Sequence, residues 1–156
     1  MLPKTHAILG LVFSLIVFAI FPEIKFTGFL IIWFSSIFID VDHYLYYVYK
    51  TRDLSLKNAY AWFVKRHNYF LKLSYRKRRK KINSRPIVPC VFHGFETALM
   101  LILLAYFIHS LFWLILTGIV FHQILDFIYI LGNGYTFRHI GSQTYNILNY
   151  KKQKKL

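Results

Sequence analysis

Long uncharged runs of hydrophobic residues alternate with short polar or basic segments along this chain. Residues 7–21 and 26–39 form two such runs, separated by a Pro-Glu-Ile-Lys turn, and residues 97–131 form a third. The third run would be roughly 50 Å long as one straight helix, more than a bilayer crossing needs, so we predict a hairpin that turns near His109. The pattern predicts an all-α fold, an integral membrane four-helix bundle made of two helical hairpins.

The expected helices belong to a single membrane domain over residues 1–156 and lie at about residues 5–21, 26–49, 91–109 and 110–131. The first two runs are short for spanning helices, which need about 20 residues, so helical continuation into 2–6 and 40–49 supplies the missing turns. A secretory signal peptide is the alternative for the first run, but no small-x-small cleavage site follows it.

Composition and charge agree with membrane insertion. Hydrophobic residues make up 56% of the chain and aromatic residues 20%, an apolar content too high for a disordered chain despite the formal charge of +14. Lys and Arg are concentrated in a basic loop over 50–85 and a basic tail over 138–156. Because these residues favour the cytoplasmic side, we expect both termini to be cytoplasmic and both hairpin turns to face outside.

The basic loop carries aromatic residues among its cations, for example Trp62 and Phe63 beside Lys65 and Arg66. This arrangement is typical of a partly helical segment that lies on an anionic leaflet, so the expected partners are membrane lipids with anionic head groups. Nucleic-acid binding by the run at 76–81 is the less favoured alternative, because a basic run beside a membrane usually sets topology and contacts lipid.

Four of the six acidic residues lie in or beside apolar segments, each near a histidine: Asp40 and Asp42 with His43, Glu96 with His93, and Asp126 with His122. A carboxylate in apolar surroundings costs several kcal/mol unless it is paired or coordinated. His6 stands at the start of the first apolar run. The expected topology places all of these groups at one membrane depth, on the cytoplasmic side.

The spacing of these residues favours a metal site. His122 and Asp126 are four residues apart and His93 and Glu96 three, which puts each pair on one helix face. Imidazole and carboxylate together suit a divalent metal, zinc above all, with manganese or iron as alternatives. We predict one or two ions held by ligands from the following set: His6, Asp40, Asp42, His43, His93, Glu96, His122 and Asp126.

Other roles are open to some of these residue types. A proton relay, ion passage or a purely structural polar network also uses Asp, Glu and His inside membranes. His67, His109 and His139 have no acidic neighbour in the sequence and are expected to be non-ligands. The single cysteine, Cys90, permits no intramolecular disulfide and is expected to be a small buried apolar residue.

The same positions resemble the membrane-bound, metal-dependent hydrolase family related to bacterial YdjM. That family has an early His, a P-D-x-D-H segment, an H-R-G-x-T-H-S segment and a late H-x-x-x-D. His6, the segment FIDVDH and the pair His122 and Asp126 match three of these elements across most of the chain, with Ile at position 39 in place of Pro. The third element departs, since FHGFETAL keeps only the Gly and a following aromatic, which would leave Glu96 as the replacement ligand.

The resemblance implies a membrane-embedded, metal-dependent hydrolase. The family is distantly similar to helical zinc-dependent phospholipases C, which suggests action on a lipid phosphoester at the cytoplasmic interface. In such an enzyme Asp42 or Glu96 would act as the catalytic base. A non-catalytic metal-binding structural or regulatory protein is the alternative, and an ion or proton carrier is less favoured because few polar groups lie toward the outer side.

Overall fold

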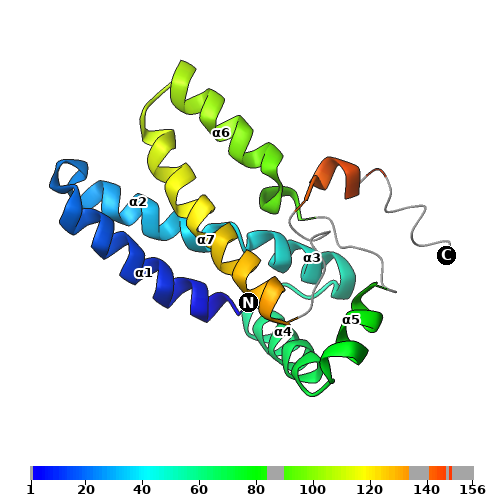
Figure 1. Ribbon diagram of the computed structural model, residues 1–156. Helices are drawn as coiled ribbons and strands as arrows, with labels where there is room; N and C mark the ends of the chain where they lie inside the picture. The colour runs from blue at the N-terminus through cyan, green and yellow to red at the C-terminus, as the bar shows by residue number, and fades with distance from the viewer. Residues whose placement is uncertain (1, 84–89, 134–140, 147, 149–156) are drawn as a thin grey trace.

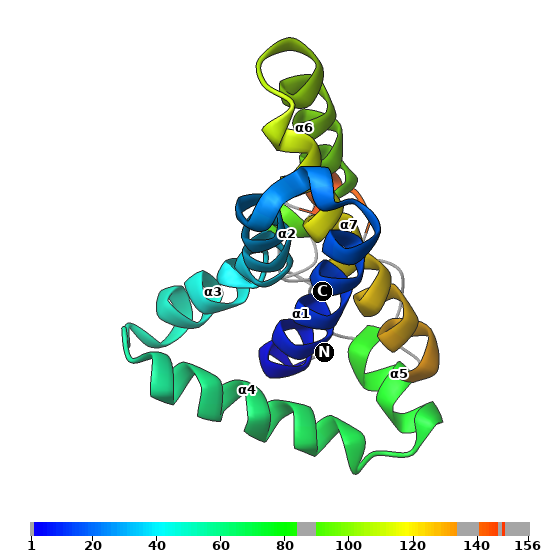
Figure 2. The same cartoon turned by 90° about the vertical axis from the view of Figure 1, so that its left-hand side faces the viewer.

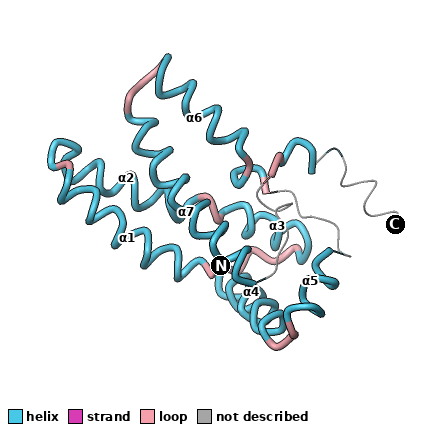
Figure 3. Tube along the Cα trace, viewed as in Figure 1, coloured by secondary structure: helices cyan, strands magenta, loops and turns pink. Residues whose placement is uncertain are grey.

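The part of the chain that the structure describes, residues 2–83, 90–133, 141–146 and 148, consists of helices joined by short turns and loops, and no strand occurs in it (Figures 1 and 3). In this computed structural model the α-helices are α1 (Pro3–Ile20), α2 (Lys25–Phe38), α3 (Val41–Thr51), α4 (Leu56–Leu71), α5 (Tyr75–Asn83), α6 (Phe95–Phe107) and α7 (Leu111–Asn133). Two 3₁₀ turns, η1 (Pro22–Ile24) and η2 (Val91–His93), precede α2 and α6. The predicted all-α class is confirmed, whereas most of the predicted basic tail over 138–156, with His139, lies outside the described residues.

Three helical stretches are long and apolar enough to cross a membrane: Pro3–Ile20, Pro22–Thr51 and Leu111–Asn133. Helix α6 is also apolar, but its 13 residues fall short of the length that a crossing requires. Large apolar side chains on these helices point outward, among them Ile16, Ile20 and Phe107. Exposed apolar surface of this extent is expected where lipid rather than water surrounds the protein. Length and composition thus support a membrane protein, and the fourth crossing stays a prediction.

A short break divides the helix that the sequence predicted over 26–49. The amide of Asp40 donates to the carbonyl of Ile37 at 3.1 Å, and the amide of His43 donates to the carbonyl of Asp40 at 3.0 Å. These three-residue hydrogen bonds tighten the chain between α2 and α3 locally. Tightened turns inside a helix often mark functional sites, and this one carries Asp40.

Small residues allow α1, α2 and α7 to pack closely. A Cβ atom added at Gly118 of α7 would lie only 2.3 Å from the carbonyl oxygen of Ile32 and 3.0 Å from the backbone nitrogen of Ser36, both in α2. A Cβ atom added at Gly10 of α1 would lie 2.1 Å from the hydroxyl of Ser36. Small residues let membrane helices approach in this way, since van der Waals packing replaces the hydrophobic effect there. We call Gly10, Ser35, Ser36 and Gly118 the small-residue seam.

The α6–α7 hairpin diverges from the α1–α2 pair. Figures 1 and 2 show the tip of the α6–α7 hairpin pointing away from the turn between α1 and α2. Leu101 of α6 packs with Leu116 and Ile119 of α7 and with Ile39, so this hydrophobic core holds the base of the hairpin. Near its tip, the hairpin leaves part of α2 uncovered.

The predicted basic loop consists largely of α4 and α5, and we call residues 56–83 the basic arm. Figure 2 shows α4 running beneath the start of α1, from the end of α3 toward α5. The turn before the arm is built on Asp53, which accepts hydrogen bonds from the Tyr47 hydroxyl at 2.6 Å and the Ser55 amide at 2.8 Å. At the other end of the arm, the Arg78 guanidinium donates to the side-chain oxygen of Asn133 at 2.8 Å and so joins α5 to the end of α7.

Candidate metal centre

Polar side chains from four distant parts of the chain meet where the small-residue seam ends. They come from the start of α1, the junction of α2 and α3, the turn η2 and the middle of α7. We call this group the His/Asp cluster, and its members are His6, Asp40, Asp42, His43, His93, His122 and Asp126. It contains every predicted ligand except Glu96.

Three histidine rings of the cluster surround one oxygen of Asp40. Asp40 Oδ1 lies 3.7 Å from His43 Nε2, and it lies 3.8 Å from His93 Nε2. His122 Nε2 lies 3.7 Å from the same oxygen and 3.4 Å from Asp126 Oδ2. A metal ion with ligands at about 2.0–2.2 Å holds neighbouring ligand atoms roughly 2.8–3.6 Å apart. Three sets of residues lie close enough together to hold an ion: His6 with Asp40 and His122, His93 with His122 and Asp126, and His43 with Cys90 and His93.

In both His93 and His122, Nδ1 makes a hydrogen bond and Nε2 has no hydrogen-bond partner. His122 Nδ1 lies 2.7 Å from the carbonyl oxygen of Ser36, which can only accept, so Nδ1 carries the proton. His93 Nδ1 lies 3.1 Å from Asp42 Oδ2. An ionised carboxylate oxygen can also only accept, so this Nδ1 carries a proton as well. The Nε2 atoms of both rings are buried without a hydrogen-bond partner. A buried polar atom in this state costs about 1–3 kcal/mol, and coordination of a cation would remove that cost.

The His6 ring lies between the carboxylates of Asp40 and Asp126 and contacts both. Its Nδ1 is 3.0 Å from Asp40 Oδ2 and its Nε2 is 3.2 Å from Asp126 Oδ1. These are the oxygens that point away from the converging rings. This geometry suits a residue that orients both carboxylates. His6 is also close enough to Asp40 and His122 to act as a ligand itself, as the sequence predicted.

His43 is the most accessible part of the cluster. Its side chain is 38% exposed, whereas those of His122 and Asp40 are 0% and 8% exposed. The ring packs against Phe63 of α4, with ring centroids 5.9 Å apart, and Nδ1 lies 3.5 Å from the Cys90 sulfur. Access to the cluster from outside the protein is therefore beside His43, next to the basic arm.

Asp42 and Cys90 each contact the Nδ1 atom of a cluster histidine, His93 and His43 respectively. Asp42 Oδ2 accepts a hydrogen bond from the Phe92 amide at 2.8 Å in addition to its contact with His93. This pair of contacts fixes the orientation of the His93 ring, as carboxylates commonly do for metal-binding histidines. Cys90 is buried, as the sequence predicted. Its place beside His43 was missed, because no spacing in the sequence links two residues so far apart.

No family model, curated protein or solved structure matches this chain. The resemblance to membrane-bound hydrolases therefore depends on the motif residues alone. Three of those motif elements, the early His, the FIDVDH segment and the late His-Asp pair, lie together in the cluster. Function must be inferred from this geometry.

Glu96 is placed apart from the cluster. Its carboxylate accepts hydrogen bonds from the Ser142 hydroxyl at 2.5 Å and from the amides of Gln143 and Thr144 at 3.2 and 3.1 Å. Gln143 in turn accepts a hydrogen bond from the Cys90 amide at 3.1 Å. These contacts tie the segment 141–146 to the start of α6. The structure thus gives Glu96 an anchoring position, not the ligand position that the sequence predicted.

Two further histidines lie outside the cluster. His67 Nδ1 lies 3.3 Å from the Tyr129 hydroxyl, and burial lowers the pKa of the His67 ring. His109, at the tip of the α6–α7 hairpin, accepts a hydrogen bond from the Leu111 amide at 3.0 Å. The first contact joins α4 to α7, and the second lies within the turn of the hairpin.

Proposed function

We propose that this is an integral membrane protein whose His/Asp cluster binds a divalent metal ion, with zinc favoured. The observation that carries the proposal is the convergence of unpartnered buried Nε2 atoms, from His93 and His122, on the carboxylates of Asp40 and Asp126. Mixed nitrogen and oxygen ligands suit zinc, and they also suit manganese or iron. The proposed ligands are His43, His93, His122, Asp40 and Asp126, with His6 as a further candidate.

We further propose that the metal serves hydrolysis of a lipid phosphoester at the membrane interface. The cluster lies at the start of α1 and the end of α2, and beside the middle of α7. A bound divalent metal supplies Lewis acidity toward an ester oxygen and activates water for attack. Within the protein, Asp42 and Ser36 hold the protons on the far side of His93 and His122. His43 lies on the accessible side, where a head group would approach.

The basic arm supports the choice of an anionic lipid. Its cations include Lys65, Lys72, Arg76 and Lys77, and all four are exposed. Such cations attract anionic head groups at a cytoplasmic membrane surface, each contributing about 1 kcal/mol. We propose that the arm lies on that surface beside the cluster and raises the local concentration of a phosphate-bearing head group. Together with the predicted fourth crossing, this orientation would put both termini in the cytoplasm.

A second candidate is a metal-dependent structural protein without turnover. The observation that favours it is the near-complete burial of His6, which is 1% exposed, and of His122, which is 0% exposed. Structural zinc sites are closed in this way, whereas catalytic sites keep one position open. The exposed edge of His43 favours the catalytic candidate.

Metal analysis by mass spectrometry of the detergent-purified protein tests the proposal. We expect about one equivalent of a divalent metal in the wild type and in Glu23→Gln, which changes an acid of η1 far from the cluster, and none in Asp126→Asn. Failure of the wild type to hold stoichiometric metal after reconstitution with zinc, manganese or iron would overturn the metal centre. Release of phosphorylated head groups from phosphatidylglycerol vesicles then separates the catalytic candidate from the structural one.

A further inference from the structure

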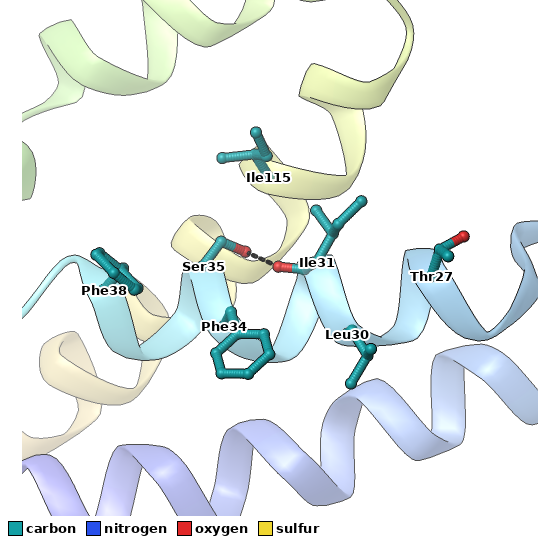
Figure 4. A pocket seen from close by; sticks show the side chains of 7 residues that line it. All are labelled: Thr27, Leu30, Ile31, Phe34, Ser35, Phe38 and Ile115. Atoms are coloured by element: carbon teal, nitrogen blue, oxygen red, sulfur yellow. Dashed lines mark hydrogen bonds between the residues drawn. The ribbon is translucent and has the colours of Figure 1, made fainter.

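An apolar groove runs along the outer face of α2. Six residues of α2 line it, from Thr27 to Phe38, and Ile115 of α7 closes one side (Figure 4). Its volume is about 600 Å³, within the range of small-molecule sites. The hydroxyl of Ser35 donates to the carbonyls of Ile31 and Ile32 at 2.7 and 3.0 Å. The lining thus offers a ligand mainly hydrocarbon.

The groove exists because the α6–α7 hairpin diverges from α2 toward its tip (Figures 1 and 2). It lies within Pro22–Thr51, one of the stretches suited to cross a membrane. Its surroundings in the bilayer are therefore hydrocarbon rather than water. Thr27 to Phe38 covers roughly 17 Å of helix, close to the thickness of one hydrocarbon leaflet, about 15 Å.

The inner end of the groove lies near the turn that carries part of the His/Asp cluster. Phe38, which lines this end, is followed along the chain by Ile39 and the proposed metal ligand Asp40. The Phe38 side chain is exposed and that of Asp40 is buried, so the two do not share a face. An amphiphile whose chain lies in the groove would have its polar end at the depth of this turn.

We propose that this groove binds one acyl chain of a membrane lipid, with the lipid head group at the His/Asp cluster. The substrate class is then a long-chain lipid that enters sideways from the bilayer, and not a soluble phosphoester. The position of the head group depends on the proposed function. Chain binding does not, because none of the groove residues belongs to the cluster.

Photocrosslinking tests the occupant directly. The full-length protein is reconstituted into vesicles of phosphatidylcholine that contain a small fraction of the same lipid with a diazirine in one acyl chain, and adducts are mapped by mass spectrometry. We expect adducts at the α2 lining and Ile115 to exceed those at exposed apolar positions of α1 several-fold. Equal labelling of both surfaces would overturn the proposal.

Filling the groove gives the matched test. Ile31→Trp should reduce adducts in the groove several-fold, while Ile16→Trp, the same change at an exposed position of α1, should leave them unchanged. Retained metal content shows that each variant is folded, and Leu30→Trp replaces Ile31→Trp if the latter does not fold. Unchanged groove adducts in a folded filling variant would overturn the proposal.

The same experiment in Asp126→Asn separates the groove from the proposed function. Groove adducts that persist without metal support chain binding whether or not the protein hydrolyses lipid. If the protein does turn over phosphatidylglycerol, Ile31→Trp should slow hydrolysis of a long-chain lipid far more than that of a dihexanoyl lipid with the same head group. Turnover combined with uniform labelling would reject the groove alone, and groove labelling without turnover would reject hydrolysis alone.

Discussion

The His/Asp cluster and the basic arm are opposites in charge and in construction. The cluster gathers three carboxylates, Asp40 and Asp42 from the α2–α3 junction and Asp126 from α7, and buries them among histidines. The arm over 56–83 contains ten Lys and Arg and no acid, and most of its cations are exposed. In our proposal a bound cation balances the carboxylates of the cluster, and the arm attracts anions. A lipid phosphate beside a metal ion is one arrangement that satisfies both regions at once.

The two regions also differ in how they are held. The cluster lies where the small-residue seam locks three helix backbones together, so its side chains have little freedom. The arm is attached mainly at its ends, through Asp53 before α4 and through Arg78 in α5. In the middle, Phe63 and His67 contact His43 and Tyr129 through their rings. Changes in the cluster should therefore abolish function outright, and changes in the arm should tune it.

Asp40→Asn is expected to have the largest effect. Asp40 Oδ1 faces the Nε2 atoms of His43, His93 and His122, and its other oxygen holds His6, so one substitution disturbs four imidazoles. We expect metal affinity to fall by more than about 100-fold, because loss of supporting contacts alone commonly costs about 10–100-fold. Isothermal titration of the metal-depleted protein with zinc measures this. An affinity within a few-fold of wild type would show that the ion binds elsewhere.

Gly118→Ala should disturb the cluster without touching it. The added methyl group would lie 2.3 Å from the Ile32 carbonyl oxygen, a backbone atom that cannot rotate away, so α2 and α7 must separate. We expect a loss of stability of about 1–3 kcal/mol, as for other overpacked interiors, and weaker metal binding. Thermal unfolding in detergent measures the stability.

Gly132→Ala is the control in the same helix. A Cβ atom at Gly132 would meet nothing within 4 Å, and alanine favours a helix over glycine by about 1 kcal/mol. This variant should be as stable as wild type or more so. Equal destabilisation by both substitutions would mean that the seam is not what positions His122.

The sequence predicted the cluster far better than the arm. Acids beside histidines inside apolar runs are so costly that their positions alone point to a shared site, and Asp40 and Asp126 do meet there. Glu96 has the same local pattern, yet it bonds to residues 142–144. The spacing of residues along a helix predicts which of them share a face. It does not predict what that face contacts, because the contact depends on chain segments far away in sequence.

The break between α2 and α3 and the second helix of the arm, α5, were beyond the reach of the hydrophobic pattern. Residues 26–49 are apolar on both sides of Asp40, so periodicity predicted one helix where the backbone tightens to bring the carboxylate inward. In the arm, the run at 76–81 is almost uniformly cationic and shows no apolar period. Its helix, α5, is joined to the end of α7 by the contact of Arg78 with Asn133, which composition does not reveal.

His6→Gln sharpens the distinction between ligands and the residues that orient them. If His6 orients Asp40 and Asp126, glutamine should keep part of one hydrogen bond, and metal affinity should fall by about 10-fold, the lower range for such contacts. If His6 is itself a ligand, the loss should equal that of Asp40→Asn. Zinc titration of both variants decides between these outcomes, with His67→Gln as the control for loss of an imidazole outside the cluster.

Asp53→Ala is expected to have the smallest effect on the metal and a clear effect on the arm. Hydrogen bonds from Tyr47, Ser55 and Asn58 lower the pKa of the Asp53 carboxyl, so it stays charged at neutral pH. Because its pKa is lowered, the carboxylate stabilises the fold at pH values above its ordinary pKa, near 3.9. This stabilisation is lost as the pH falls through the lower pKa that the carboxyl has in the folded protein. Alanine at position 53 should mimic that acid state at pH 7.

Hydrogen exchange measures the consequence for the arm. Amides at the start of α4, whose first turn receives the cap from Ser55 and is positioned by Asp53, should exchange several-fold faster in Asp53→Ala than in wild type. Metal content should be unchanged, since Asp53 bonds to the turn and not to the cluster. Faster exchange accompanied by metal loss would show that the arm and the cluster form one cooperative unit. In that case the arm, through the contact of Phe63 with His43, would help to close the site rather than only attract lipid to it.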